Sequence, residues 1–135
     1  MFMSRFRVYY EDTDMAGIVY YANYLKFLER GRSDVVRAAG IDQMEMRDGR
    51  GLVFAVARVE IDYHAPARFG DVLVVETQTE RVGGATLIMP QRILVEDRLV
   101  VSASVRVACM TLDGKIQRFP GDVRKALADG PQGIG

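Results

Sequence analysis

From residue 52 onward the chain consists of four segments rich in valine, isoleucine and threonine, and this feature constrains the fold most. Such segments predict β-strands. The turns between the last three, Gly83-Gly84 and Glu96-Asp97, have hairpin length, so these strands should run antiparallel. A parallel nucleotide-binding sheet is thereby excluded. The expected strands are Leu52 to Tyr63, Val72 to Val82, Thr86 to Val95 and Leu99 to Thr111.

The last segment shows the clearest alternation. Every second residue from Leu99 to Cys109 is apolar, whereas Ser102, Ser104 and Arg106 occupy the opposite face. One face of the sheet should therefore lie against a core. Pro90, inside the third segment, cannot donate a ladder hydrogen bond, so we expect a bulge or an outward-facing position there.

One long helix is expected before the strands, from Ala22 to Ala39. Apolar residues recur there at steps of three and four, which predicts one buried stripe. Gly31 in mid-helix costs about 1 kcal/mol relative to alanine, so we expect the sheet to approach the backbone closely at that point. Gly40 fits the left-handed residue that ends a helix.

Shorter elements complete the chain. An extended segment from Phe6 to Tyr10 precedes a polar turn, and residues 41–51 should be irregular or form a short helical turn at a pocket rim. A short helix is expected over Val123 to Ala128, and residues 129–135 should fray.

One long helix and five antiparallel strands predict an α+β hotdog fold, in which a curved sheet wraps a long central helix. At 135 residues the chain should form a single domain, residues 1–135, without needing a metal or disulfide. One copy would leave sheet edges and one sheet face exposed. We therefore expect a homo-oligomer, either a dimer with continuous sheets or a dimer of dimers, that is, a homotetramer.

The composition argues against several classes of protein. Eighteen basic and eighteen acidic residues give zero formal net charge, which argues against nucleic acid as a partner. Cys109 is the only cysteine, so no disulfide framework or zinc spacing exists. No apolar run has the length of a signal peptide or a transmembrane segment. We expect an unprocessed cytoplasmic protein.

Residues 9–24 bring a carboxylate and a glycine turn to the start of the long helix. The first N–H groups of a helix are unpaired and lie at its positive end, so they could stabilise an oxyanion. Asp14 is the candidate base or nucleophile, and the N–H groups near Tyr21 and Ala22 are candidate donors. Gly17 permits close backbone approach. By chemistry alone, an aspartate at this place is more often a cap or a turn residue.

Other polar residues carry weaker signals. His64 has no recognisable acid or serine partner nearby in the sequence, which favours a surface role over a triad or metal ligand. Glu29 and Arg32 could form a local ion pair or a pocket wall. Five arginines are candidates for binding phosphates of a carrier such as coenzyme A: Arg58, Arg68, Arg81, Arg92 and Arg106.

Two strings carry a resemblance. The first is Tyr10-Glu11-Asp12-Thr13-Asp14, continued by Gly17, Val19-Tyr20-Tyr21 and Asn23-Tyr24, with Glu29 and Arg32 behind it; the second is Tyr63-His64-Ala65-Pro66-Ala67-Arg68, followed by Asp71. They resemble the 4-hydroxybenzoyl-CoA thioesterase family of hotdog proteins, and most nearly its Tol–Pal-associated acyl-CoA thioesterase branch. The resemblance extends from about Phe6 to Ala128.

This resemblance implies hydrolysis of an acyl-CoA or acyl-carrier thioester, with sites between subunits, no metal, and no cofactor beyond the coenzyme A of the substrate. It implies that Asp14 is nucleophile or general base and that backbone N–H groups around Tyr21 bind the thioester oxygen. The positions carried over as substrate-binding are Gly17, Val19, Tyr20, Ala22, Asn23, Tyr24 and Arg68.

One position departs from the Tol–Pal branch, since Tyr21 stands where that branch commonly carries a histidine. A backbone role survives this change, but a side-chain acid–base role does not. The acyl group stays open among short aliphatic, longer aliphatic and aromatic groups. Two other functions also stay open: a hotdog hydratase or dehydratase, and a non-catalytic acyl-CoA-binding or scaffold protein.

Overall fold

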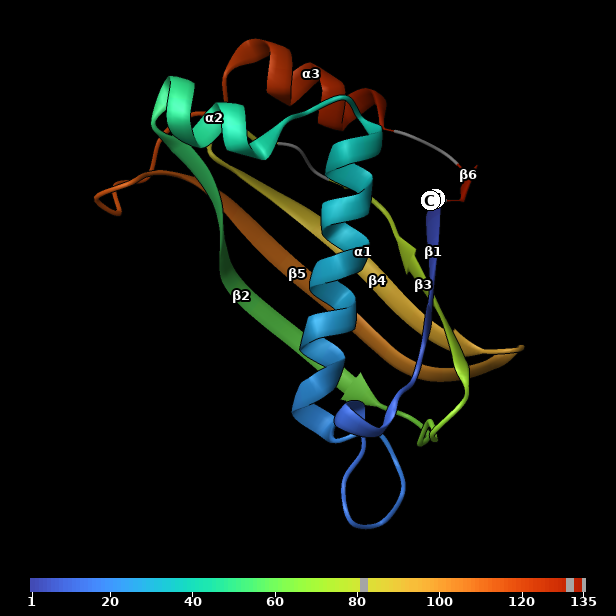
Figure 1. The fold of residues 1–135 in the computed structure, drawn as a ribbon. Helices are drawn as coiled ribbons and strands as arrows, with labels where there is room; N and C mark the ends of the chain where they lie inside the picture. The colour runs from blue at the N-terminus through green and yellow to red at the C-terminus, as the bar shows by residue number, and fades with distance from the viewer. Residues whose placement is uncertain (81–82, 131–132, 135) are drawn as a thin grey trace.

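The long helix α1 lies across one face of a curved sheet, while α2 and α3 lie together at one end of the molecule (Figure 1). The computed structural model describes residues 1–80, 83–130 and 133–134. Its elements in chain order are β1 (Phe2–Arg7), the 3-10 turns η1 (Tyr10–Asp12) and η2 (Tyr21–Asn23), α1 (Tyr24–Ala38), α2 (Gln43–Arg50), β2 (Leu52–Tyr63), β3 (Val72–Thr77), β4 (Thr86–Val95), β5 (Arg98–Thr111), α3 (Gly121–Asp129) and β6 (Gly133–Ile134).

The strands form one sheet in the order β2-β5-β4-β3-β1-β6. Neighbours among β1 to β5 pair antiparallel, and the two-residue β6 pairs parallel with β1. The expected five-stranded antiparallel sheet is therefore confirmed, with one short additional strand. The bounds predicted for β2 and β4 are also those of the structure.

The first strand lies earlier than predicted. β1 covers Phe2–Arg7 instead of residues 6–10, and residues 10–12 form the turn η1. Phe2 and Ser4 both point into the interior. A serine in the buried series weakens the apolar alternation from which a strand is predicted.

The third strand ends earlier than predicted, at Thr77. Its expected end, Val82, lies outside the described residues. Beyond Thr77 the Gln78 N–H still donates to the carbonyl of Pro90 at 2.9 Å, so pairing with β4 continues. Pro90 belongs to the outward-facing series of β4, which was one of the two expected positions.

The sheet does approach α1 at Gly31, as its place in the helix indicated. A Cβ atom added to Gly31 would lie 2.7 Å from Cγ1 of Val75 and 3.1 Å from Oγ1 of Thr77. Only glycine allows this contact without displacing buried side chains of β3. Gly40, after the helix, has the expected left-handed conformation with φ of 86°.

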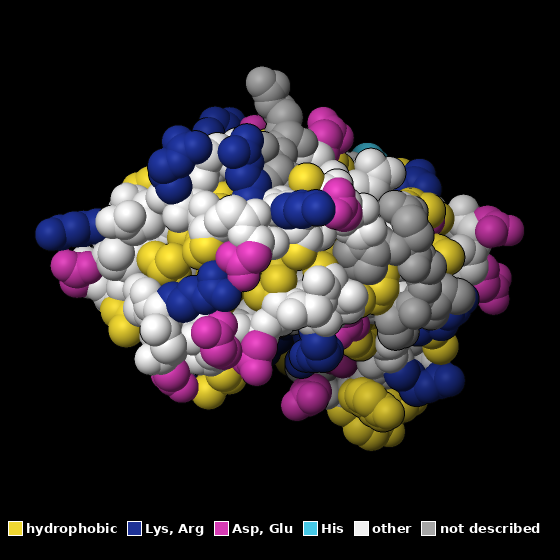
Figure 2. Space-filling view, turned by 90° about the horizontal axis from the view of Figure 1, so that it is seen from above, with side chains coloured by type: hydrophobic (Ala, Val, Ile, Leu, Met, Phe, Trp, Pro, Cys, Tyr) yellow, Lys and Arg dark blue, Asp and Glu magenta, His cyan; other side chains and the backbone are white. Residues whose placement is uncertain are grey.

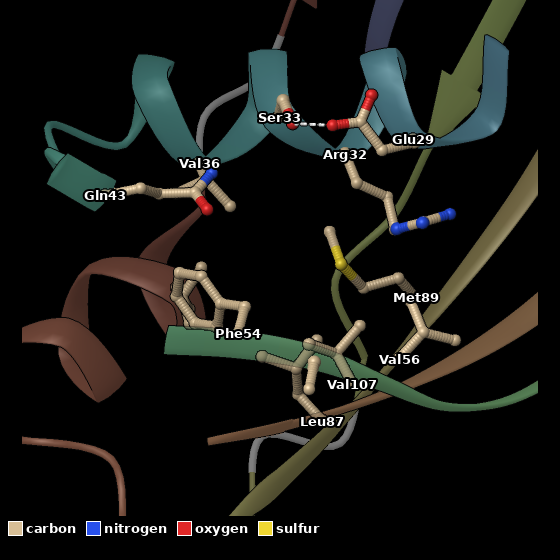
Figure 3. A pocket seen from close by; sticks show the side chains of 12 residues that line it. Glu29, Arg32, Ser33, Val36, Gln43, Phe54, Val56, Leu87, Met89 and Val107 are labelled. Atoms are coloured by element: carbon tan, nitrogen blue, oxygen red, sulfur yellow. Dashed lines mark hydrogen bonds between the residues drawn. The ribbon is translucent and has the colours of Figure 1, made fainter. Parts of the chain in front are cut away.

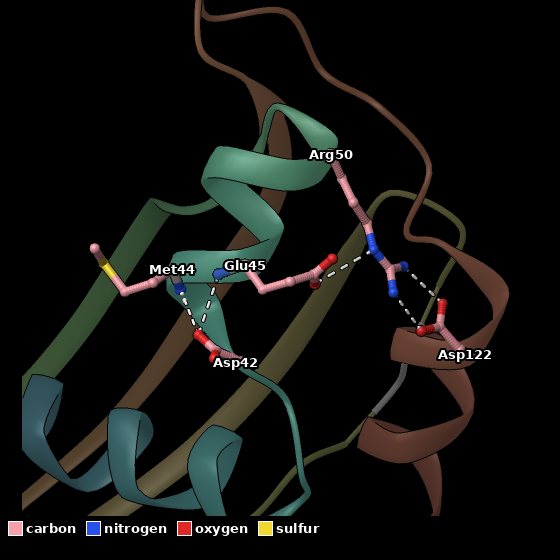
Figure 4. Close-up of polar contacts among 5 residues, drawn as sticks. All are labelled: Asp42, Met44, Glu45, Arg50 and Asp122. Atoms are coloured by element: carbon pink, nitrogen blue, oxygen red, sulfur yellow. Dashed lines mark hydrogen bonds and ion pairs between the residues drawn. The ribbon is translucent and has the colours of Figure 1, made fainter.

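Residues 41–51 are more regular than expected, because they contain the eight-residue helix α2. The carboxylate of Asp42 accepts hydrogen bonds from the N–H groups of Met44 and Glu45 at 3.0 and 3.1 Å (Figure 4). This side chain caps the helix. Gly51, with φ of 68°, ends it.

The end of the molecule formed by α2 and α3 carries both positive and negative side chains around apolar patches (Figure 2). Arg50 of α2 forms a bidentate ion pair with Asp122 of α3, with N···O distances of 2.9 and 2.8 Å (Figure 4). This pair fixes α3 against α2. None of the described helices is long and apolar enough to cross a membrane.

Candidate active site

A buried carboxylate organises the segment before α1. Asp12 is only 5% exposed, and its two oxygens accept from the backbone N–H of Tyr9 at 2.8 Å and the side-chain amide of Asn23 at 2.6 Å. Its backbone carbonyl accepts from the N–H of Tyr20 at 2.9 Å. Asp12 thus joins the end of β1 to the start of the helix. Sequence reasoning missed this role, although Asp12 belongs to the same motif as Asp14.

Asp14 lies in the tight loop that this framework holds. A β-bridge joins Thr13 to Val19, and the Asp14 N–H donates to the carbonyl of Ile18 at 2.9 Å. Gly17 has φ of 78° and its N–H donates to the Asp14 carbonyl at 3.0 Å. One Asp14 carboxylate oxygen accepts from the N–H of Ala16 at 2.9 Å. In the single chain, Asp14 is therefore a partly exposed turn-forming residue whose second oxygen has no partner within the described residues.

The helix start presents unpaired backbone donors. η2 begins at Tyr21, whose side chain is 61% exposed, and the N–H of Asn23 donates to the Tyr20 carbonyl at 2.8 Å. Within residues 1–80 and 83–130, the N–H groups of Tyr21 and Ala22 have no hydrogen-bond acceptor. Such first-turn donors are the groups that an oxyanion would use.

Four tyrosines surround this helix start: Tyr20, Tyr21, Tyr24 and Tyr63. The Tyr21 and Tyr63 rings are in edge contact, with ring centroids 6.0 Å apart. The ring centroids of Tyr20 and Tyr21 are 5.0 Å apart. Tyr24 is buried, and its hydroxyl accepts from the Ala67 N–H at 3.1 Å. Burial raises the pKa of both Tyr24 and Tyr63. The phenols of Tyr24 and Tyr63 are therefore neutral near pH 7.

The other candidate positions divide between core and surface. Val19 and Tyr24 are buried in one apolar cluster, and the Asn23 side chain faces Asp12. Arg68 is exposed, and a β-bridge between Ile18 and Arg68 brings its segment beside the Asp14 loop. These positions remain predictions as substrate contacts.

His64 does have a serine neighbour, which lies far away in the sequence. Its Nε2 is 2.7 Å from Oγ of Ser102, and the pair is exposed on the sheet. No acidic side chain among the described residues bonds to this histidine. Within the described ranges, no three His, Cys, Asp or Glu side chains are grouped as a metal site would require.

A cavity of about 130 Å³ lies farther along α1, between α1, α2 and the sheet (Figure 3). Its walls are mainly apolar, with Phe54, Leu87 and Met89 among them, and Arg32 and Glu29 also line it. Glu29 accepts from the Ser33 hydroxyl at 2.9 Å, and the described residues contain no Glu29–Arg32 ion pair. Of the two expectations for this pair, the pocket wall is confirmed.

The helix wrapped by a curved antiparallel sheet, with unpaired amides and a carboxylate loop at the helix start, defines a hotdog-fold protein of the thioesterase type. Residues 16–102 match the family described as the thioesterase superfamily, and the chain belongs to this family. The resemblance to hotdog thioesterases is thus confirmed. The matched residues begin after Asp14, so its role stays a prediction.

Proteins similar to this chain carry thioesterase names. The chain is 41% identical to the acyl-CoA thioesterase YbgC of Haemophilus influenzae over 123 residues, covering 90% of each protein. It is 39% identical to the acyl-CoA thioester hydrolase YbgC of Escherichia coli over 105 residues, covering 77% of this chain and 78% of that protein. The crystal structure of a probable thioesterase from Bartonella henselae superposes with a TM-score of 0.84 at 38% identity, covering 87% of this chain and 98% of that one.

Proposed function

We propose that the protein is an acyl-CoA thioesterase that hydrolyses a thioester to free acid and coenzyme A. The observation that carries this proposal is the pair of unpaired N–H groups at Tyr21 and Ala22, beside the loop that holds Asp14. Membership of the thioesterase superfamily and the names of the two YbgC relatives support it. No metal or separate cofactor enters the proposal, and EDTA should leave the activity unchanged.

In the proposed reaction the thioester oxygen accepts hydrogen bonds from the N–H groups of Tyr21 and Ala22. Asp14 either removes a proton from the attacking water or attacks the carbonyl carbon itself, forming an anhydride that water then cleaves. In both routes one water is consumed, the C–S bond breaks and the thiolate leaves. The helix-start donors stabilise the negative charge that develops on the carbonyl oxygen.

The proposal includes a homodimer, because the cavity and Asp14 lie apart in one chain. From Tyr24 to Arg32 the helix rises about 12 Å. β2 is a twelve-residue edge strand that pairs only with β5 among the described strands, and it runs opposite to α1 (Figure 1). Two-fold pairing of two β2 edges would place the Asp14 loop of one copy beside the cavity of its partner. A dimer of dimers and a cytoplasmic location remain parts of the same proposal.

The test is thiol release from a panel of acyl-CoAs, followed with a thiol-reactive dye. Wild-type protein should release thiol, and Asp14→Asn should lose at least about a hundredfold in kcat. The matched control is Asp48→Asn, which changes an exposed acid on α2. Full activity in Asp14→Asn would remove Asp14 from the mechanism. Water added to an unsaturated acyl chain without thiol release would contradict the proposed reaction itself.

A further inference from the structure

Arg32 lines the cavity beside Met89, and its guanidinium has spare hydrogen-bond donors (Figure 3). An arginine side chain has five N–H donors. Within the described residues Arg32 makes one hydrogen bond, from Nη1 to Oε1 of Gln91 at 3.0 Å, and no carboxylate lies within ion-pair distance. Burial lowers its pKa. A partly buried charge with unmet donors is costly unless another group accepts from it.

A buried glutamine of the sheet holds the guanidinium of Arg32 in place. Gln91 is only 2% exposed, and its Nε2 donates to the carbonyl of Leu28 and to Oγ1 of Thr77, each at 2.9 Å. Both of these bonds use the amide nitrogen, so the amide oxygen is left facing Arg32. Thr77 and Gln91 come from paired strands of the sheet, which makes the support rigid.

Most of the other residues that line the cavity are apolar, including Val56, Met89 and Val107, and the polar ones are Glu29, Ser33 and Gln43 (Figure 3). A plain alkyl group would fill the space but would leave the Arg32 donors without an acceptor. Glu29 lines the same cavity, so the two side chains contribute charges of opposite sign. An uncharged oxygen fits this neutral pair better than a carboxylate, which Glu29 would repel.

We propose that Arg32 is a specificity-determining residue that donates a hydrogen bond to an uncharged oxygen, such as a hydroxyl, at the far end of the acyl group. The proposal rests on the proposed thioesterase function. A cavity of roughly 150 Å³ can hold benzene, so the 130 Å³ here suits an acyl tail of about six carbons.

The experiment compares kcat/KM within pairs of acyl-CoAs that differ by one oxygen: hexanoyl against 6-hydroxyhexanoyl, and benzoyl against 4-hydroxybenzoyl. The aliphatic and aromatic pairs identify which kind of group carries the oxygen. Wild-type protein should favour the hydroxylated member of at least one pair by about tenfold or more. Adipoyl-CoA, whose tail ends in a carboxylate, should be a poorer substrate than 6-hydroxyhexanoyl-CoA.

Arg32→Met keeps much of the side-chain length and removes the donors. It should lower the ratio of kcat/KM between the hydroxylated and the unsubstituted member about tenfold, so that the ratio falls toward one. Arg37→Met is the matched control, since Arg37 lies on the same helix with its side chain 76% exposed, and it should retain the wild-type ratio.

Equal wild-type kcat/KM values within both pairs would overturn the role of Arg32 without any variant, even if Arg32→Met failed to fold. A preference that persists in folded Arg32→Met would overturn it as well. In both cases thioesterase activity itself would stand. The proposed function would fall only if no thioester in the panel released thiol, and this inference would then fall with it.

Discussion

The side-chain amide of Asn23 donates a 2.6 Å hydrogen bond to the carboxylate of Asp12 in the protein interior. The other carboxylate oxygen holds the N–H of Tyr9. One buried side chain thereby fixes both ends of the segment that carries Asp14 and leads to the free N–H of Tyr21. The geometry of the candidate active site depends on this bond more than on any contact of Asp14 itself.

Asp12→Asn should therefore damage both stability and activity. The new amide has one acceptor instead of two, so either the Tyr9 N–H or the Asn23 amide loses its partner. Losing a hydrogen bond to a charged group costs about 1.5–3 kcal/mol, which urea denaturation would measure. Glu11→Gln, at the exposed neighbouring position, should change neither property. An Asp12→Asn protein with wild-type stability and turnover would show that the loop is held in another way.

Gly31→Ala should destabilise the protein although alanine is the better helix former. The added methyl would stand 2.7 Å from Cγ1 of buried Val75, and such overpacking typically costs about 1–3 kcal/mol. Gly49→Ala is the matched control, because its methyl would meet only the flexible Glu45 carboxylate of exposed α2. Helix propensity should stabilise that variant by up to about 1 kcal/mol. Chemical denaturation of both would reveal opposite signs; equal signs would rule out the close sheet contact.

The Arg50–Asp122 pair predicts a pH-dependent stability. Hydrogen bonding to Arg50 lowers the pKa of Asp122 from 3.8 to about 2. Because the folded-state pKa is depressed, the stabilisation is present above the unfolded-state pKa near 4 and is lost as pH falls toward 2.

The melting temperature of Asp122→Asn should therefore lie below that of wild type at pH 6, and the difference should shrink as the pH falls from 4 toward 2. Since both side chains are exposed, 1 M salt should reduce the difference at pH 6. Lys115→Met, which removes another exposed cation, should leave the pH profile unchanged. A difference between Asp122→Asn and wild type that is as large at pH 2 as at pH 6 would point to a cause other than this ion pair.

Local patterns predicted much of the fold. The bounds of β2 and β4 are those predicted, because the residues that form each strand and the turn residues that end it lie next to one another in the sequence. Gly31 could be interpreted because a helix-interior glycine has few explanations. In contrast, α2 buries only Met46, so its sequence offers little periodicity from which a helix could be predicted.

The candidate site was less predictable because its parts meet only in the folded chain. Arg32 and Gln91 are 59 positions apart, and nothing in either segment indicates that they touch. The Asp12–Asn23 bond spans eleven positions across a loop whose path local propensity does not determine. The unpaired amide at Tyr21, by contrast, follows from a helix start alone and was expected from the sequence.

That amide can be removed without removing the helix. Tyr21 occupies the first position of η2, where proline is well tolerated, and Tyr20 before it has the extended conformation, φ −61° and ψ 129°, that proline requires of its predecessor. Tyr21→Pro should keep the melting temperature of Tyr21→Ala, because both lose the ring and only the proline variant also loses the N–H. If this N–H binds the oxyanion, kcat for thiol release should fall about 10²–10³-fold from Tyr21→Ala to Tyr21→Pro. Equal turnover in the two variants would exclude the Tyr21 amide as an oxyanion donor and would leave Ala22 to supply it.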